Sequence, residues 1–387
     1  MDTLALLSNN QVAMRDTVRR FSRKKIGPRA AEIDRSGEFP RDVYEAMAEL
    51  GLFGLTLPVE AGGSSADIVT YALVHEELAQ VSGTAANLQA ASESAILLND
   101  HAPATLRERY LPGVLDGSIV PAFALTEPTA GSDARGLRAR AVRDGDRYVI
   151  NGAKQFTTFA AVADFIVVLA ITDPTKDRGH ISAILVEAST PGVQVAKAED
   201  LVGVRGTATA SVYFDNCAVP VENLIGKEGE GLRLGLNQIN KGRIAVAAMA
   251  VGLAQGAHDL ALAYAHERMQ FGKPIFEFQA VQFKLAQMAT RIDAARLLYL
   301  TAAQLEDRGT GSNRLTSEAK LYASETAAWV TEEALQVFGG YGYTRSNPVE
   351  RYWRDAKITQ IYEGTTNIQH IVIARILSKE HRERSVV

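Results

Sequence analysis

Near its end the chain reads Arg351-Tyr-Trp-Arg-Asp-Ala-Lys-Ile-Thr-Gln-Ile-Tyr-Glu-Gly-Thr-Thr-Asn367. Glu363 stands in this stretch between the apolar Ile361-Tyr362 pair and Gly364. Apolar residues recur at helical spacing from Ile368 onward, so a helix is expected to start just beyond an N-cap at Thr365 or Thr366. The pattern therefore places a carboxylate in a loop just ahead of a helix N-terminus, beside apolar neighbours.

Two interpretations of Glu363 follow from this placement. Burial would raise the pKa of its carboxyl and make it a base usable near neutral pH. Alternatively, Glu363 simply favours the positive end of the following helix, as acidic residues at helix starts commonly do. The local sequence by itself favours the second interpretation.

The string from Arg354 to Thr365 resembles the signature of the acyl-CoA dehydrogenases, flavoproteins that oxidise acyl-CoA thioesters to 2-enoyl-CoAs. In that family the Glu of this motif is the catalytic base, so the resemblance implies this role for Glu363. The same motif implies further contacts: Thr365 and Asn367 with FAD, and Tyr362 and Gly364 with the substrate.

Composition excludes several other classes of protein. The net charge of −4 argues against a nucleic-acid partner, because no basic excess is available to replace phosphate counterions. The single cysteine, Cys217, excludes an intrachain disulfide, and the seven histidines are scattered, so no metal site is expected. No apolar run approaches the roughly 20 residues of a membrane span. Residues 1–7 lack the basic start and long apolar stretch of an export signal, which predicts a cytoplasmic protein.

The pattern along the chain predicts an α+β fold with three domains. Residues 1–120 are typical of an N-terminal helical domain. Residues 121–227 hold short β-branched runs separated by turn formers, which predicts a β-barrel-like or sandwich domain with a hairpin turn at Asp144-Gly145. Residues 228–387 are Ala-rich and amphipathic, as in a four-helix bundle. Helices are expected over 67–81, 84–99, 104–116, 230–267, 277–308, 314–338 and from about 366 onward. The same order of domains is the fold of the family.

A second motif reads Phe123-Ala-Leu-Thr-Glu-Pro-Thr-Ala-Gly-Ser-Asp133. It predicts a strand that runs into a loop with exposed backbone N–H groups, and its tripeptide Gly-Ser-Asp alone is also typical of an ordinary turn. The full string resembles the family motif that contacts flavin and substrate. Thr129 replaces the usual Gly, and a Thr would be strained if the position required a positive φ. The implied FAD contacts are Phe123, Leu125, Thr126, Gly131 and Ser132, with Ser132 also on the substrate.

A third motif, Asn151-Gly-Ala-Lys-Gln-Phe-Thr-Thr158, offers an aromatic ring and a hydroxyl. By itself Phe156 is typical of a core strand. The resemblance implies instead that Phe156 stacks on the flavin and that Thr158 lies near flavin N5. Phe159-Ala160 departs from the Asn-Gly or Ser-Gly that usually follows, so an unusual turn is expected there.

The segment Asn240-Lys-Gly-Arg-Ile-Ala-Val246 lies on the first long bundle helix. Arg243 is either a solvated cation or, as the resemblance implies, a residue beside the active site. Some family members carry their base at the position of Gly242, which cannot serve here. The matching substrate contacts are Asn240 and Arg243, together with Thr207 from the β-domain.

Two further segments complete a dinucleotide site by resemblance. Arg268-Met-Gln-Phe-Gly-Lys-Pro274 through Gln279 supplies a cation and an aromatic ring, and Gln336-Val-Phe-Gly-Gly-Tyr-Gly-Tyr343 supplies a Gly-rich turn that is otherwise typical of a helix C-cap. The implied FAD contacts are Arg268, Phe271, Gln279, Gln336, Gly339 and Gly340. Family members share each FAD between two subunits through these segments, which implies a homotetramer built as a dimer of dimers. No GxGxxG sequence supports a Rossmann site.

The resemblance therefore implies FAD-dependent dehydrogenation of an acyl-CoA, with electrons passed to an electron-transferring flavoprotein. Rival functions on the same fold are an acyl-CoA oxidase, an enoyl-CoA reductase and a lyase on a modified acyl-CoA. Oxygen reactivity of the reduced flavin separates the oxidase from the dehydrogenase. A non-catalytic acyl-CoA-binding protein would lack the base or Arg268, and both are present. The strings Gly242-Arg-Ile and Glu363-Gly-Thr-Thr most resemble short-chain and branched short-chain members of the family, which implies a short or branched acyl chain. Glutaryl-type members use an Arg on the fourth helix, and 84–99 holds none, which argues against a dicarboxylate.

Overall fold

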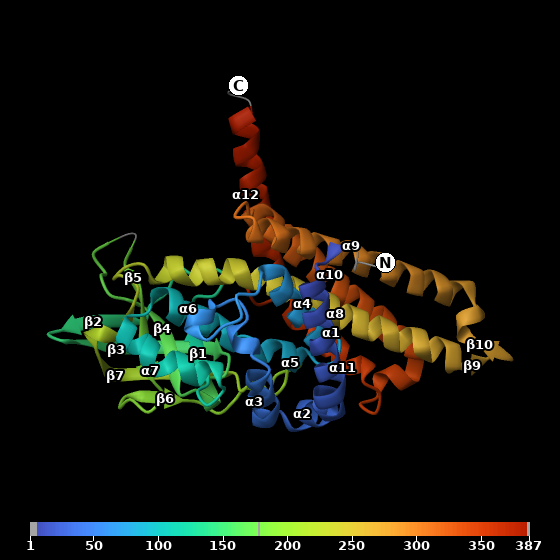
Figure 1. Ribbon diagram of the computed structural model, residues 1–387, viewed down its shortest axis with the longest axis horizontal. Coiled ribbons are helices and arrows are strands. Elements are labelled where there is room, and N and C mark those ends of the chain that lie inside the picture. The colour runs from blue at the N-terminus through green and yellow to red at the C-terminus, as the bar shows by residue number, and fades with distance from the viewer. Residues whose placement is uncertain (1–5, 177–178, 385–387) are drawn as a thin grey trace.

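The computed structural model describes residues 6–176 and 179–384, so most of the N-terminal segment behind the export prediction lies outside the described residues. Helices form the N-terminal third, a sheet follows, and long helices complete the chain, as predicted (Figure 1). The N-terminal α-helices are α1 (Asn9–Phe21), α2 (Ala30–Ser36), α3 (Arg41–Glu49), α4 (Ile68–Ala79), α5 (Gly83–Leu88), α6 (Ala91–His101) and α7 (Ala104–Leu115).

The helix expected over 84–99 is wrong in one respect, because the chain forms two helices there. Gln89 is fully buried, and its Nε2 donates to the carbonyl of Leu52. Around it the backbone bonds span three residues, from Gln89 N–H to Ala86 O and from Ser92 N–H to Gln89 O. Such bonds tighten a helical turn and redirect the axis. The break sets the direction in which α6 presents its side chains.

The central domain is one eight-stranded sheet in the order β6-β7-β3-β2-β4-β5-β8, with β1 beside β4. Its strands are β1 (Pro121–Ala124), β2 (Arg140–Asp144), β3 (Arg147–Thr157), β4 (Phe165–Ile171), β5 (Ile181–Glu187), β6 (Val193–Val195), β7 (Ala210–Pro220) and β8 (Leu224–Ile225). The hairpin predicted at Asp144-Gly145 is confirmed, since Asp144 pairs with Arg147 and Gly145 has φ +60°. Alternate residues of β4 enter two cores: Val167 and Leu169 pack with α6 and α7, and Ile166 and Val168 pack on the opposite face.

The C-terminal domain contains the long helices expected from the sequence: α8 (Gly231–Glu267), α9 (Gln279–Asp307), α10 (Asn313–Phe338) and α12 (Thr366–Arg384). A short hairpin of β9 (Met269–Gln270) and β10 (Lys273–Pro274) follows α8. Helix α11 (Val349–Ile358) was not predicted, and α12 projects away from the body of the protein (Figure 1). Among the described residues, α8 is the one helix long and apolar enough to cross a membrane, and 83% of its most apolar window is buried inside the protein.

Helix α4 belongs to the N-terminal part of the chain but packs against α8 (Figure 1). Gly252 and Gly256 of α8 make this approach possible. A Cβ at Gly252 would lie 2.3 Å from the carbonyl oxygen of Glu76, and one at Gly256 would lie 2.5 Å from that of Gln80. Because neither position tolerates a side chain, the two helices fix each other's position.

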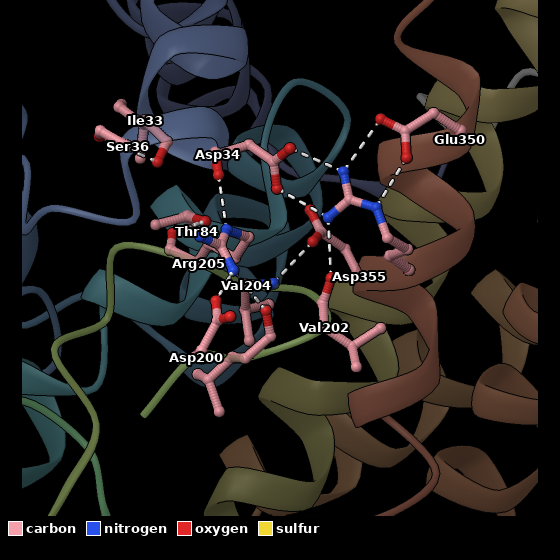
Figure 2. A network of polar contacts seen from close by, with 12 residues as sticks. Ile33, Asp34, Ser36, Thr84, Asp200, Val202, Val204, Arg205, Glu350 and Asp355 are labelled. Atoms are coloured by element: carbon pink, nitrogen blue, oxygen red, sulfur yellow. Dashed lines mark hydrogen bonds and ion pairs between the residues drawn. The ribbon is translucent and has the colours of Figure 1, made fainter. Parts of the chain in front are cut away.

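A polar network joins α11 to the other two domains (Figure 2). Arg354 donates to both carboxylate oxygens of Asp34 on α2, at 2.8 and 2.6 Å, and also pairs with Glu350 at 2.7 Å. Asp355 accepts the N–H of Val204, and Arg205 donates to the carbonyl of Asp34 at 2.7 Å. These bonds hold the helix that precedes Glu363 against both neighbouring domains.

Candidate active site

Glu363 lies in the loop between α11 and α12. Its φ of +52° places it in the left-handed region, which non-glycine residues rarely adopt, and Gly364 follows with φ +87°. The Oγ1 of Thr365 accepts the N–H of Ile368 at 3.3 Å, so Thr365 caps α12. The loop and the cap predicted from the sequence are therefore confirmed, and the strained backbone aims the Glu363 side chain inward.

Two residues that the sequence analysis missed hold this loop. Gln369 Nε2 donates to the carbonyls of Glu363 and Gly364 at 3.2 and 2.8 Å, and Lys320 Nζ donates to Gly364 O at 2.8 Å. Both side chains are fully buried. The sequence pattern could have indicated Lys320, because it is a lysine on a face of α10 that otherwise carries small residues.

The electrostatic surroundings of Glu363 are those of a base. Its Oε2 is buried and has no hydrogen-bond partner among the described residues. Burial raises the pKa of Glu363 to about 7, although the nearby Lys320 and Arg243 oppose the rise. Burial likewise lowers the pKa of Lys320 to about 8. Desolvation rather than a favourable helix end dominates, so the structure favours the first interpretation of Glu363.

Arg243 is buried, which excludes a solvated helix-face cation. Its Nη1 donates to Asn240 Oδ1 at 2.9 Å and to Ser317 Oγ at 3.3 Å, while Nε has no partner within the described part of the chain. Arg243 therefore keeps one donor free beside the base loop, and Asn240 orients it.

A cavity of ≈ 120 Å³ lies directly against Glu363. Its lining includes Tyr362 and Glu363 from the base loop and Phe123 and Thr158 from the β-domain. Tyr362 is fixed by a hydrogen bond from its hydroxyl to Met249 Sδ at 3.0 Å. Residues from three separate sequence motifs thus meet around one space large enough for a small organic group.

Phe159, where the sequence departs from the family pattern, also lines this cavity. Its backbone is left-handed, with φ +67° and ψ −3°, so the unusual turn expected there is present. The ring is buried against Phe39 and Tyr44, with centroids 5.8 and 6.2 Å away. Aromatic packing therefore offsets the backbone strain of a bulky residue at a position suited to Asn or Gly.

The second motif is organised by a buried ion pair that the sequence analysis did not predict. Glu127 accepts Lys154 Nζ at 2.8 Å and the N–H groups of Arg138 and Ala139 at 2.7 and 3.0 Å. Lys154 also donates to the carbonyl of Leu125 at 3.1 Å. These bonds fold the loop after β1 and attach it to β3.

The loop leaves Gly131 and Ser132 exposed at its tip. Thr129 is not among the residues with positive φ, so the strain considered for it does not arise. The carbonyl of Thr126 accepts the N–H of Gln155 at 2.9 Å. Phe156 has φ +54° and is 59% exposed, so it is not the core strand residue of the alternative interpretation.

Thr207 is one of the expected substrate contacts that do not line the cavity at Glu363. It is buried, and its hydroxyl donates to Val204 O at 3.1 Å and lies 3.0 Å from Thr209 Oγ1. Its carbonyl accepts the N–H of Phe159 at 2.9 Å. In this arrangement Thr207 supports the turn at Phe159, and its side chain does not line the cavity at Glu363.

The segments 268–279 and 336–343, which were expected to complete a dinucleotide site, lie beyond the C-terminal end of α8. Arg268, Gly339 and Gly340 share a cavity of ≈ 620 Å³, in which the Arg268 guanidinium lies 5.4 Å from the ring centre of Tyr341. Phe271 is 92% exposed, and Gln279 and Gln336 are exposed as well. The two segments meet within one chain, so their pairing does not itself require a second subunit. At about 1.5 Å of rise per residue, α8 carries Arg268 roughly 40 Å from Gly242.

Gly242 faces the base, as its family position implies. A Cβ at Gly242 would lie 3.0 Å from Glu363 Oε2 and 3.3 Å from an oxygen of Glu93. Glu93, on α6, also lines the cavity. This second carboxyl was not among the site residues expected from the sequence. The sequence could have indicated Glu93, because it is a lone acidic residue in an otherwise buried helix.

Comparison with known proteins agrees with this geometry. Family models match three consecutive parts of the chain: the acyl-CoA dehydrogenase N-terminal domain at residues 8–118, the middle domain at 122–217 and the C-terminal domain at 229–378. A short-chain-specific acyl-CoA dehydrogenase of Clostridium acetobutylicum is 41% identical over 370 residues, covering 95% of this chain and 98% of that one.

Solved structures give the same result. The butyryl-CoA dehydrogenase of Megasphaera elsdenii has a TM-score of 0.92 at 37% identity, covering 96% of this chain and 98% of that one. A chain from a study of the electron transferring flavoprotein of Acidaminococcus fermentans has a TM-score of 0.91 at 41% identity with the same coverage. The chain, with its base loop, its buried Arg243 and its three matched domains, therefore belongs to the acyl-CoA dehydrogenase family of oxidoreductases.

Proposed function

We propose that this protein is an FAD-dependent enzyme that converts a short straight or branched acyl-CoA to the trans-2-enoyl-CoA and passes the electrons to an electron-transferring flavoprotein. The observation that carries the proposal is the one cavity that Glu363 and Tyr362 line together with Phe123 and Thr158. An acyl group in this space lies between a base and the motif that resembles a flavin-binding segment. The cytoplasm is the compartment we expect.

Glu363 removes the α-proton of the thioester. A base with a pKa of about 7 is ionised often enough near neutral pH and still holds the proton once transferred. Its Oε2 makes no hydrogen bond among the described residues, so it is free to accept that proton. Arg243 and Lys320 stabilise the carboxylate before the reaction without neutralising it.

The thioester carbonyl must be polarised for its α-proton to become acidic. The N–H of Glu363 donates to no acceptor in the part of the chain that the structure describes. The left-handed backbone at Glu363 and Gly364 presents this donor beside its own carboxylate. A fixed N–H at this point stabilises the negative charge that develops on the thioester oxygen.

The residues of the second and third motifs fit a flavin. The exposed loop tip at Gly131 and Ser132, the exposed ring of Phe156 and the hydroxyl of Thr158 offer donors and a stacking surface. When bound, FAD supplies the acceptor for the β-hydrogen, which leaves as hydride. Arg268, Phe271, Gln279, Gln336, Gly339 and Gly340 lie too far from Glu363 to bind the same FAD. We therefore propose that they complete the site of a second subunit in a dimer of dimers with about one FAD per chain.

The size of the cavity supports a short acyl chain. Its volume of ≈ 120 Å³ is close to the ~150 Å³ of a protein cavity that admits benzene. Phe159, which packs against Phe39 and Tyr44, limits how far an acyl chain can extend in this cavity. The names of the short-chain-specific and butyryl-CoA relatives agree with this substrate class.

Anaerobic titration of the flavin-loaded protein with a panel of acyl-CoAs tests the proposal. Butyryl- and isobutyryl-CoA are expected to bleach the flavin faster than palmitoyl-CoA. Faster bleaching by palmitoyl-CoA would overturn the short-chain assignment, and no bleaching by any acyl-CoA would favour a binding protein or a lyase. Rapid reoxidation by oxygen would indicate an oxidase, and reduction of an enoyl-CoA by the reduced enzyme as the dominant reaction would indicate a reductase.

A further inference from the structure

Glu93 separates two cavities. On one side it lines the space that contains Glu363, and on the other it lines a second cavity of ≈ 190 Å³. The second cavity is also bordered by Asp100, Lys241 and Asp307, all of which are exposed. The side chain of Glu93 therefore stands between the buried base and a space that reaches the protein surface.

The two carboxyl groups are close neighbours. Glu363 Oε2 and Glu93 Oε1 lie 3.0 and 3.3 Å from the point that a Cβ of Gly242 would occupy. They are consequently no more than about 6 Å apart, a range in which like charges disfavour joint ionisation. A rotated side chain or one bridging water spans this gap, and the missing side chain of Gly242 keeps it open.

The charges around the pair are unequal. Arg243 and Lys320 act on Glu363, whereas Glu93 has no ion pair or side-chain hydrogen bond among the described residues. Burial and the negative Glu363 raise the pKa of Glu93 well above its usual range. His75, on the same cavity, is kept neutral because burial lowers its pKa to about 4, and burial raises the pKa of Tyr71 and Tyr362. The surroundings therefore favour the negative charge on Glu363, beside Arg243 and Lys320, and the proton on Glu93.

We propose that Glu93 relays the α-proton from Glu363 to the second cavity and so returns the base to its charged form. The proposal rests on the proposed function, since it concerns the proton that Glu363 takes from the substrate. Oε2 of Glu363 is buried, and the acyl group closes the first cavity, so the proton needs another way out. Glu93 borders both spaces and provides it.

The step conserves atoms and charge. The α-C–H bond breaks and an O–H bond forms on Glu363 Oε2. That proton passes to one oxygen of Glu93 while the proton already on the other oxygen leaves into the second cavity. Glu363 is then anionic and Glu93 is again neutral, and one proton has reached solvent. The β-hydrogen is not part of the relay.

A non-oxidisable substrate analogue separates proton removal from proton release. An acyl-CoA with sulfur in place of the β-carbon loses its α-proton but cannot lose hydride. In the FAD-loaded enzyme in D₂O, enolate formation is followed by its long-wavelength absorption band, and α-deuterium in the recovered analogue is measured by mass spectrometry. Glu93→Gln preserves the size and neutral charge of protonated Glu93 and removes only its ability to pass a proton.

We expect Glu93→Gln to form the enolate at the wild-type rate and to incorporate deuterium at least about tenfold more slowly, since loss of a positioned proton carrier is commonly worth more than this. Glu93→Asp, which keeps a proton carrier, is expected to restore part of the exchange. Asn99→Ala is the matched control, because Asn99 lies on the same helix, lines neither cavity and carries no titratable group. Unchanged deuterium incorporation in Glu93→Gln, or an equal fall in enolate formation and exchange, overturns the relay.

An infrared measurement tests the same proposal without turnover. At neutral pH the wild-type spectrum is expected to contain a protonated-carboxyl band that Glu93→Gln lacks and Asn99→Ala retains. If the wild-type and Glu93→Gln spectra are identical in this region, Glu93 is ionised and the relay is refuted. Failure of the proposed function looks different: the wild-type enzyme would then form no enolate with any analogue, whatever the state of Glu93.

Discussion

Two regions along α8 differ in their exposure to solvent. In its N-terminal half, Gly242 and Arg243 lie against the loop that carries Glu363. Beyond its C-terminal end, Arg268 lies beside the open turn at Gly339 and Gly340. The first region is enclosed: Arg243, Lys320 and Glu363 Oε2 are all buried. The second exposes Phe271 almost completely. A raised pKa requires removal from water, so proton chemistry must be enclosed by the chain's own side chains. Under the proposed function the second region binds a large charged cofactor, so its groups must remain accessible to that cofactor.

The largest effect in the enclosed region is expected for Glu363→Gln. The substitution keeps the size of the side chain but removes the base, so flavin reduction by acyl-CoA is expected to fall by about 10²–10⁴-fold. FAD content and acyl-CoA binding are expected to stay unchanged, because both depend on other residues. Stopped-flow reduction together with the flavin-to-protein absorbance ratio measures the two effects. Flavin reduction at a near wild-type rate in the variant would show that Glu363 is not the base.

The enclosed region is also expected to control the pH dependence of the rate. Glu363 must be ionised to act, and its pKa of about 7 means that activity is lost as pH falls below that value. Two pH units below the pKa, about 1% of a carboxyl remains ionised, so flavin reduction at pH 5 is expected to be about 100-fold slower than its plateau. A rate profile that stays flat from pH 8 to pH 5 would show that the base is not desolvated.

Moving the base to position 242 tests the packing between Gly242 and Glu363. With Glu363→Gln the retained side chain would lie 3.0 Å from a new Cβ, so adding Gly242→Glu is expected to give no rescue. In Glu363→Gly the space is free, and Gly242→Glu is expected to raise activity about tenfold over Glu363→Gly alone, the lower range of general-base effects. Rescue in the Gln background and not in the Gly background would contradict the observed packing.

The open region is expected to affect binding rather than chemistry. Arg268→Ala removes the cation of this region, and we expect FAD to bind about tenfold more weakly, in line with the loss of one charge-assisted contact. The rate of reduction in molecules that retain FAD is expected to be normal. Flavin release on dilution and single-turnover reduction separate the two, and a tight FAD complex of a monomer would refute the role proposed for this end.

The smallest effect is expected at Phe271. Its side chain is 92% exposed and loses almost no burial on truncation, so Phe271→Ala is expected to change the free energy of unfolding of the subunit by no more than about 0.5 kcal/mol. Chemical denaturation of the isolated subunit checks this. A larger loss would mean that Phe271 is already packed within its own chain.

Much of the architecture follows from local sequence patterns. The helix around Val43 between Pro40 and Gly51, the hairpin at Asp144-Gly145 and the long helices of the bundle each depend on spacing and turn chemistry within a few residues. The base loop was predictable for the same reason, since Thr365 caps the next helix. The helix over 84–99 could not be divided in advance, because its break depends on a bond from Gln89 to distant Leu52.

The sequence by itself determined the three-domain order, the loop with Glu363 and, by resemblance, the family. Only the tertiary structure decided which charges meet. Lys320 and Gln369 reach the base loop, Glu127 pairs with Lys154, and Glu93 faces Glu363, each from a different element. No local pattern marks such pairs, because a side chain's pKa and partners depend on what long-range packing brings against it. The ionisation of this active site is therefore a property of the folded chain and not of its motifs.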